Sequence, residues 1–254
     1  MTHWYRQSFR KDYLALYPHR GLPEARADAA AIVALVSPPK EEPLLDLCCG
    51  AGRHLQALFE LGFADLTGVD LSRALLRVAR RRLDRQGAAA VRLVRSDMRR
   101  IPFRARFATI LSLFTSFGYF DRSQEDEAVL TAACAALHPG GTLVMDTLNR
   151  PWTIAHLRPR SEQALGGAHV TIERALSADG SRVEKTTRIE PATGRRNLYR
   201  ESVRMYSADD LRAMLARSGF ADVRFHGGLD GCPYDEACPR IVAVARRAKG
   251  GGAP

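Results

Sequence analysis

A glycine turn flanked by acidic residues is the part of the chain best suited to chemistry. Residues 44–52 read Leu-Leu-Asp-Leu-Cys-Cys-Gly-Ala-Gly, which predicts a buried strand, a Gly-x-Gly turn and a helix that begins at Arg53. Glycine lets a ligand approach the backbone, and a helix N-terminus offers free N–H groups. Asp70 ends the next predicted strand, at about the 20-residue spacing at which a nucleotide-binding fold places a carboxylate on ribose hydroxyls. These residues together indicate a site for a nucleoside.

The turn departs from the dinucleotide fingerprint Gly-x-Gly-x-x-Gly at its third glycine. Leu55 stands at that position, where glycine serves tight helix packing beside a pyrophosphate. A ligand with ribose and adenine but no pyrophosphate does not need this glycine, and S-adenosylmethionine (SAM) is such a ligand. A nicotinamide dehydrogenase is therefore disfavoured, while a tight strand-to-helix turn in an unrelated α/β protein stays open at this point.

Further motifs follow in a defined order. After the third predicted strand come Asp97, whose carboxylate can accept the adenine amino proton, and Met98, whose thioether can cover the ring. With these residues the chain resembles class I SAM-dependent methyltransferases of the small-molecule branch. The resemblance rests on Asp-Leu-x-Cys-Gly-x-Gly-Arg-His, Gly-Val-Asp-Leu-Ser, Ser-Asp-Met-Arg, Leu-Phe-Thr-Ser-Phe-Gly-Tyr-Phe and His-Pro-Gly-Gly between residues 46 and 141, and on the opening Asp-Tyr-Leu-Ala-Leu-Tyr-Pro-His-Arg and closing Pro-Arg-Ile-Val-Ala-Val-Ala segments.

The resemblance implies roles for residues in several parts of the chain. The N-terminal segment is expected to fold over the methionyl end of SAM, where Arg20 pairs with the carboxylate and a tyrosine hydroxyl hydrogen-bonds it. The cofactor-binding residues expected are Tyr13, Tyr17, Arg20, Asp46, Cys48, Gly50, Gly52, Asp70, Leu71, Ser96, Asp97, Met98 and Leu113. The substrate-binding residues expected are Tyr5, Phe117, Tyr119 and Asn149.

Methyl transfer from SAM is an in-line displacement, which mainly requires alignment and the removal of water. A base is optional when an acceptor amine is already neutral, so none is assigned; the candidates are His226, Tyr119 and His54. The fourth predicted strand ends in Ser-Leu-Phe-Thr-Ser-Phe, not in the Asn/Asp-Pro-Pro-aromatic motif of methylases that act on base amino groups. This difference argues against nucleic acid as the partner.

Alternating strand and helix signals define the elements that must position these residues. Strands are predicted over 44–49, 65–70, 91–96, 107–114 and 142–148, with helices over 52–61, from Ser72 to about Gln86, and from Ser123 to before His138. A helix from Ser207 and strands over 221–226 and 240–245 follow. Such alternation forms parallel sheets through right-handed crossovers. The prediction is an α/β fold with a Rossmann-like, doubly wound, mostly parallel seven-stranded sheet.

Residues 150–206 interrupt this regularity with alternating apolar and polar runs and a turn at Asp179-Gly180. They predict an antiparallel β cap inserted after the fifth strand, which serves as a substrate lid. Residues 1–149 and 207–248 then form the SAM-binding domain, with helices in 1–37 covering the cofactor. The tail, 249–254, is expected to be disordered.

Composition narrows the remaining classes. The net charge is +10 and arginine supplies most of it; the run of arginines over 77–85 is interpreted as a solvated helix face. Five cysteines, Cys232 and Cys238 among them, lack metal-ligand spacing, so no metal is expected. With no signal peptide or spanning segment in the sequence, the expected location is the cytoplasm, without membrane association, as a monomer or homodimer.

The function predicted is transfer of a methyl group from SAM to N or O of a small molecule. A fold does not fix its chemistry, so three alternatives stay open. The first is a SAM-fold enzyme that catalyses a non-methylating reaction such as a cyclisation. The second is an RNA methyltransferase, and the third is a non-catalytic SAM-sensing module.

Overall fold

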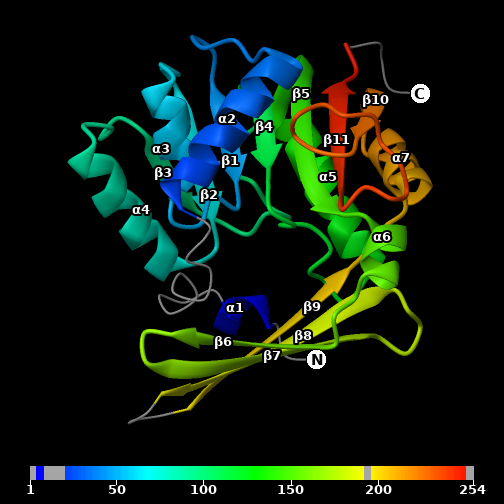
Figure 1. Cartoon of the computed structure of the whole chain (residues 1–254). Helices are drawn as coiled ribbons and strands as arrows, with labels where there is room; N and C mark the ends of the chain where they lie inside the picture. Colours follow the sequence, from blue (N-terminus) through cyan, green and yellow to red (C-terminus); the bar gives the residue numbers. More distant parts are fainter. Residues whose placement is uncertain (1–3, 9–20, 192–195, 250–254) are drawn as a thin grey trace.

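The computed structural model of the chain describes residues 4–8, 21–191 and 196–249, which form two sheets with helices (Figure 1). The larger sheet has seven strands in the order β10-β11-β5-β4-β1-β2-β3, and the smaller has four in the order β6-β7-β8-β9. Within these described ranges, no helix combines the length and the apolar character that a bilayer crossing needs.

The large sheet is parallel apart from one strand. Its parallel core comprises β1 (Leu44–Leu47), β2 (Leu66–Asp70), β3 (Arg92–Arg95), β4 (Phe107–Ser112) and β5 (Leu137–Leu148), followed later in the chain by β10 (Phe220–His226) and β11 (Arg240–Arg247). β11 lies antiparallel to both of its neighbours, β5 and β10. From β1, the chain builds the sheet first toward β3 and then, from β4, in the opposite direction. The predicted doubly wound, mostly parallel sheet is therefore confirmed, and the ends of β1 and β4 flank its switch point.

Successive residues of the central strands point to opposite faces, and each face has its own helices. Ile110 belongs to the core under α5 (Ser123–Ala136) and α7 (Ala208–Arg217). Leu111, the next residue, packs in the core under α2 (Leu22–Val36), α3 (Arg53–Glu60) and α4 (Arg73–Arg85). Because β4 is buried on both faces, most of its residues are apolar, as expected for a central parallel strand.

Local signals place the helix starts where the sequence predicts them. The Ser72 hydroxyl accepts the Leu75 N–H at 3.3 Å and caps α4. Ser207 and Asp210 form a reciprocal capping box at the start of α7. β5, in contrast, begins five residues before the predicted Thr142, because Leu137 already pairs with Phe107 before a register shift.

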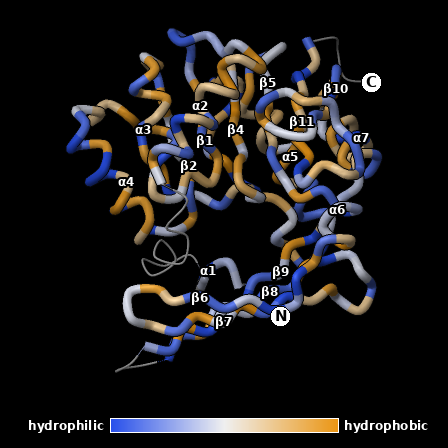
Figure 2. The backbone as a smooth tube through the Cα atoms, viewed as in Figure 1, coloured by the Kyte–Doolittle hydropathy of each residue, from blue (hydrophilic) through white to orange (hydrophobic). Residues whose placement is uncertain are grey.

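The cap confirms an antiparallel sheet inserted after β5, with detail that the sequence did not predict. It begins with a short helix, α6 (Arg150–Ala155), and continues through β6 (Arg160–Leu165), β7 (Ala168–Leu176), β8 (Arg182–Pro191) and β9 (Asn197–Arg204). Figure 2 shows apolar segments along the central strands, whereas the cap strands mix polar and apolar residues. Among the described residues of the cap sheet, the apolar cluster has just two buried members, Val170 and Tyr199, so the cap depends on docking to the rest of the chain.

A short N-terminal helix, α1 (Tyr5–Ser8), lies between the cap and the central sheet (Figure 1). The Ser8 hydroxyl donates to the carbonyl of Arg200 in β9 at 2.8 Å. The longer helix α2 instead packs against α3 on one face of the large sheet. Of these two helices, α1 is the one that the structure places beside the ends of the strands.

Candidate functional site

A cavity of about 470 Å³ opens at the carboxyl ends of β1, β2, β3 and β4. This is the edge where open α/β sheets bind ligands, and the volume suits a small molecule. Of the residues predicted from sequence, those that line the cavity are Tyr5, Asp46, Cys48, His54, Gly50, Asp70, Leu71, Ser96, Asp97, Met98, Leu113 and Tyr119. The fold therefore brings together side chains from four strand ends and from α1.

Asp70 is held rigidly at the end of β2. Its Oδ2 accepts the backbone N–H of Gly50 at 2.8 Å, and its Oδ1 accepts that of Ser72 at 2.7 Å. Burial raises the pKa of the Asp70 carboxyl, and these backbone bonds oppose the rise. Each carboxylate oxygen keeps a further acceptor position, so Asp70 can still receive a pair of hydroxyl groups from a ligand.

Asp46 is a buried acidic residue of the cavity, and one of its carboxylate oxygens lacks a hydrogen-bond partner among the described residues. Its side chain is 2% exposed, and its Oδ2 has no hydrogen-bond partner in the part of the chain that the structure describes. Burial raises the pKa of Asp46 to about 6, against the opposing influence of His54. A buried carboxylate without a donor is costly, and a cationic ligand group would relieve that cost. SAM carries such groups, so the residues present fit it.

Affinity for SAM is expected to decrease as the pH is lowered, because Asp46 then becomes protonated. Binding a cation favours the ionised carboxylate, so below the pKa of about 6 the dissociation constant should rise by up to about tenfold per pH unit. The same raised pKa destabilises the ligand-free fold as pH rises from about 4 to 6, because ionisation costs more in the folded chain than in the unfolded chain. Calorimetric titration from pH 5 to 8 measures the first effect. Asp46→Asn should abolish the slope; an equal slope in that variant would contradict the assignment.

The two glycines of the turn have different tasks. Gly50 has a φ of 53°, and a Cβ added there would meet nothing nearer than Leu75 Cδ1 at 3.9 Å, so its open side is the cavity wall. Gly52 has a φ of 72°, and its Cβ would lie 3.0 Å from that of Ala79 in α4. Gly52 does not line the cavity; it allows α3 and α4 to approach each other.

Asp97 and Met98 close the side of the cavity next to β3. Arg99 donates to both Asp97 oxygens, at 2.6 and 3.0 Å. Burial acts to raise the pKa of Asp97, but the bonds from Arg99 outweigh it and lower that pKa. The Met98 Sδ lies 3.5 Å from the Cys48 Sγ, which places two polarizable sulfurs beside each other at the edge of the cavity.

The segment after β4 is strained, and sequence reasoning missed what holds it. Phe114 and Thr115 both adopt left-handed backbone conformations, with φ of 57° and 59°, which cost non-glycine residues energy. Asp146 accepts the Phe114 N–H on Oδ2 at 3.0 Å and the Thr115 N–H on its carbonyl oxygen at 3.0 Å. Arg240 donates to Asp146 at 2.7 Å and to the Thr115 hydroxyl at 2.9 Å. Arg240 belongs to the closing Pro-Arg motif, which does not by itself predict this clamp.

His54 and Tyr119, two of the three candidate bases, lie at the cavity. The His54 Nε2 is 3.1 Å from Asp28 Oδ2, and the ring stacks on Phe114 with centroids 5.6 Å apart. Tyr119 packs edge-on against Trp4 with centroids 4.9 Å apart. His54 is therefore fixed by two neighbours, whereas Tyr119 belongs to an aromatic wall shared with α1.

Besides Gly52, three predicted residues do not line the cavity. Phe117 is buried in the core, with its ring centroid 5.5 Å from that of Tyr206. Asn149 is 1% exposed, and its amide donates to the carbonyls of Asp235, Glu236 and Cys238 at 3.1, 3.1 and 2.7 Å. His226 lies 3.2 Å from the Gly231 carbonyl, within the connection that leads to β11. Tyr13, Tyr17 and Arg20, and the tail over 250–254, lie outside the described residues.

Arginines from several elements line the cavity. Arg82 was interpreted as part of a solvated face of α4, but it is half-buried and lines the cavity together with Arg53. Burial, followed by the charge of Arg53, lowers the pKa of Arg82. Arg6, Arg73 and Arg95 complete the basic lining. The cavity thus combines acidic groups at the strand ends with basic groups at its rim.

The cavity lies at the switch point of a doubly wound sheet, which is where nucleotide-binding α/β domains hold their ligands. Residues 44–141 match the model of a family described as "Methyltransferase domain". The dTDP-3-amino-3,6-dideoxy-alpha-D-glucopyranose N,N-dimethyltransferase of Streptomyces fradiae is 34% identical over 170 residues, which are 65% of this chain and 60% of that protein. The dTDP-3-amino-3,4,6-trideoxy-alpha-D-glucopyranose N,N-dimethyltransferase of Streptomyces venezuelae is 34% identical over 55% of each chain.

Solved structures extend the likeness to nearly the whole chain. The SAM-bound amino pentose methyltransferase CalS10 of Micromonospora echinaspora is 27% identical, with a TM-score of 0.69 over 94% of this chain and 97% of that one. The methyltransferase CcbJ of Streptomyces caelestis shares the fold, with a TM-score of 0.75 at 20% identity, over 89% and 96%. The chain spans only 55–60% of the length of the curated relatives it matches. Residues 44–141 therefore match a methyltransferase domain, and the chain as a whole shares the fold of these solved methyltransferases.

Proposed function

We propose that the protein transfers a methyl group from SAM to the amino nitrogen of a small molecule, and that this acceptor is an amino sugar. The buried Asp46 carboxylate, whose Oδ2 has no hydrogen-bond partner among the described residues, lies beside the firmly bonded Asp70, and this is the observation that supports SAM binding most directly. The amino sugar is suggested by the names of relatives that are 34% identical to this chain. The chain's own cavity supplies the rest of the argument.

The cavity offers one group for each part of the cofactor. Asp70 would accept the ribose hydroxyls, Asp97 the adenine amino group, and Met98 would cover the ring. Asp46 would face the cationic end, and Leu113 would pack between them. When bound, SAM supplies a methyl group made electrophilic by the sulfonium. Tyr13, Tyr17 and Arg20 are proposed to complete the methionyl side.

The chain's contribution to catalysis is alignment and exclusion of water. Tyr5, Tyr119 and Phe120 form an aromatic wall of the cavity, against which an acceptor can be oriented. A neutral amine attacks with its own lone pair, so the chain needs only a nearby group to receive the released proton. Tyr119 and His54 line the cavity, and His226 does not, so the first two are the proposed proton acceptors.

We further propose a division of labour between the two parts of the chain. Residues 1–149 and 207–248 bind the cofactor, and residues 150–206 select the acceptor. The described part of the cap contributes no residue to the cavity lining. The cap therefore acts on the acceptor through the elements that it touches, namely α1 and the segment that follows β4.

A labelled-methyl experiment tests the proposed reaction. The protein is incubated with methyl-tritiated SAM and, separately, a dTDP-linked 3-amino sugar, the matching sugar with a hydroxyl in place of the amine, and tRNA. Label in the amino sugar alone is the expected result. Label only in the hydroxyl sugar or only in tRNA would overturn the amine assignment. SAM consumption without label transfer would indicate a non-methylating reaction instead. Asp84→Ala, which removes an exposed carboxylate of α4, is the matched control and should leave activity unchanged.

A further inference from the structure

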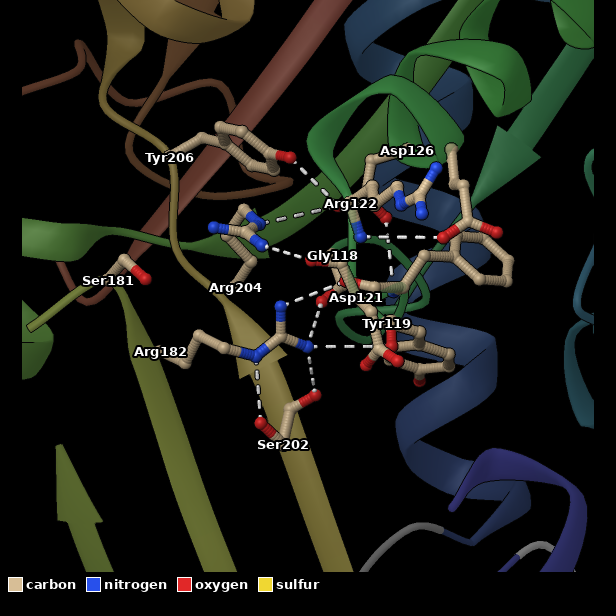
Figure 3. Close-up of polar contacts among 12 residues, drawn as sticks. Gly118, Tyr119, Asp121, Arg122, Asp126, Ser181, Arg182, Ser202, Arg204 and Tyr206 are labelled. Atoms are coloured by element: carbon tan, nitrogen blue, oxygen red, sulfur yellow. Dashed lines mark hydrogen bonds and ion pairs between the residues drawn. The ribbon is translucent and has the colours of Figure 1, made fainter. Parts of the chain in front are cut away.

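The cap is fastened to the cavity by an arginine of its own. Arg182 begins β8, and its guanidinium reaches across to the segment that follows β4 (Figure 3). It donates to the carbonyl oxygens of Phe120 at 2.9 Å, Gly118 at 3.2 Å and Tyr119 at 3.5 Å. Three consecutive carbonyl groups of the cavity segment thus accept hydrogen bonds from one cap side chain.

The same guanidinium is anchored within the cap. Its Nε donates to the Ser202 hydroxyl and its Nη2 to the Ser202 carbonyl oxygen, each at 2.8 Å. Ser202 lies on β9, the neighbouring strand. Because β9 fixes the Arg182 guanidinium, the position of the cap sheet determines where the carbonyl groups of residues 118–120 are held.

A second set of contacts fixes the distance between the cap and the segment that follows β4. The Arg204 N–H donates to the Gly118 carbonyl at 2.7 Å, and a Cβ on Gly118 would lie only 2.3 Å from the Arg204 carbonyl oxygen. Nearby, the fully buried Asp126 accepts the Tyr206 hydroxyl at 2.8 Å (Figure 3). These contacts hold the end of β9 against the Gly118 turn, with or without Arg182.

Tyr119 is the residue through which this junction reaches the cavity. Its carbonyl accepts from Arg182, while its ring lines the cavity and packs against Trp4 of the N-terminal segment. Its carbonyl and its ring are thus fixed by different parts of the chain.

We propose that Arg182 is a positioning residue for the acceptor: by holding the carbonyl groups of Gly118, Tyr119 and Phe120, it sets the Tyr119 ring in the cavity wall. The proposal rests on the proposed function insofar as Tyr119 faces an acceptor for methyl transfer. Arginine suits the task because its planar fork carries five N–H donors in fixed directions. A lysine has three donors on one atom and cannot reach the same set of acceptors.

An optical test of this role does not depend on the reaction. The chain has two tryptophans, so Trp152→Phe leaves Trp4, which packs on Tyr119, as the sole reporter. In that background, Arg182→Met should at least double the acrylamide quenching of Trp4 fluorescence, with Arg182→Lys intermediate. Arg188→Met is the matched control, since Arg188 is an exposed arginine of the same strand that pairs with Glu173. Unchanged quenching in a folded Arg182→Met variant would overturn the proposal.

Kinetics then separate positioning of the acceptor from general damage. With the acceptor that takes label in the transfer assay, Arg182→Met should raise the acceptor KM at least tenfold, while the dissociation constant of SAM stays within twofold. Equal losses in SAM affinity and acceptor KM would indicate a merely structural role and overturn the proposal. If Arg182→Met fails to fold, Arg182→Lys and Ser202→Ala carry the same comparison. A failed transfer assay alongside increased Trp4 quenching would reject the proposed reaction but keep the role of Arg182 in positioning Tyr119.

Discussion

Replacing Asp70 with alanine is expected to weaken SAM binding by about 2–3 kcal/mol, which is roughly 30- to 150-fold, since a pair of charge-assisted hydrogen bonds is lost. The side chain is oriented before the ligand arrives, because backbone N–H groups of Gly50 and Ser72 hold its two oxygens. No conformational cost of ordering the carboxylate is therefore subtracted from its bonds to the ribose. The dissociation constant from calorimetry measures the loss.

Controls must separate lost ligand contacts from a damaged turn. Asp84→Ala removes a carboxylate that is exposed on α4 and should leave SAM affinity within twofold of the unmodified protein. Thermal unfolding of Asp70→Ala shows whether the Gly50 turn survives the loss of its acceptor. Unchanged SAM affinity in a well-folded Asp70→Ala protein would remove the ribose assignment.

The part of the site that sequence predicts well is the part made by short-range geometry. The strand and the Gly-x-Gly turn follow from their own residues, and the Gly50–Asp70 bond only requires that β1 and β2, which are consecutive strands, pair in parallel. Parallel pairing follows from the alternation of strands and helices. The acidic groups at this sheet edge, Asp46, Asp70 and Asp97, could therefore be predicted from residues 44–98.

The segment after β4 shows why other residues were misplaced. The predicted strand runs to Phe114, but β4 ends at Ser112, and Phe114 and Thr115 turn into left-handed conformations. Counting side chains by strand alternation fails beyond that point. As a result Phe114 lines the cavity and Phe117 packs in the core. The Asp146–Arg240 clamp that holds this turn joins residues far apart in sequence, and no local pattern reports it.

Asn149 illustrates a different difficulty. It follows β5 directly, so its position at a strand end suggested a ligand-facing role. In the sheet, β5 has β11 on its outer side. The Asn149 amide donates hydrogen bonds to three carbonyl groups of the connection that leads into β11. The order of strands, which a single sequence does not reveal, decides which strand ends face the cavity.

Removing the cap sheet is expected to abolish methyl transfer while leaving SAM affinity within about tenfold, or 1.4 kcal/mol. The pairing register provides the design. Arg160 pairs with Glu173, Glu173 with Thr186, and Thr186 with Arg200, so residues 160 and 200 lie level with each other across three strand spacings, about 14 Å. A Gly/Ser linker of ten residues, with a root-mean-square span of about 17 Å, can replace residues 160–200. Tyr206 and its bond to Asp126 are then retained.

The positions of the cavity residues explain why SAM binding should survive while methyl transfer is lost. The described residues that line the cavity all precede the cap, so the cofactor contacts remain. The acceptor wall loses Arg182 and the Arg200 carbonyl that binds Ser8 of α1. An unfixed wall admits water and misaligns the acceptor, and misplacement by about 1 Å already costs about a hundredfold in rate. Calorimetry with SAM measures the affinity that should be retained, and the labelled-methyl assay measures the methyl transfer that should be lost. A variant that folds but does not bind SAM would make the cap part of the cofactor site. One that binds SAM and transfers methyl at the original rate would place the acceptor site wholly within the central domain.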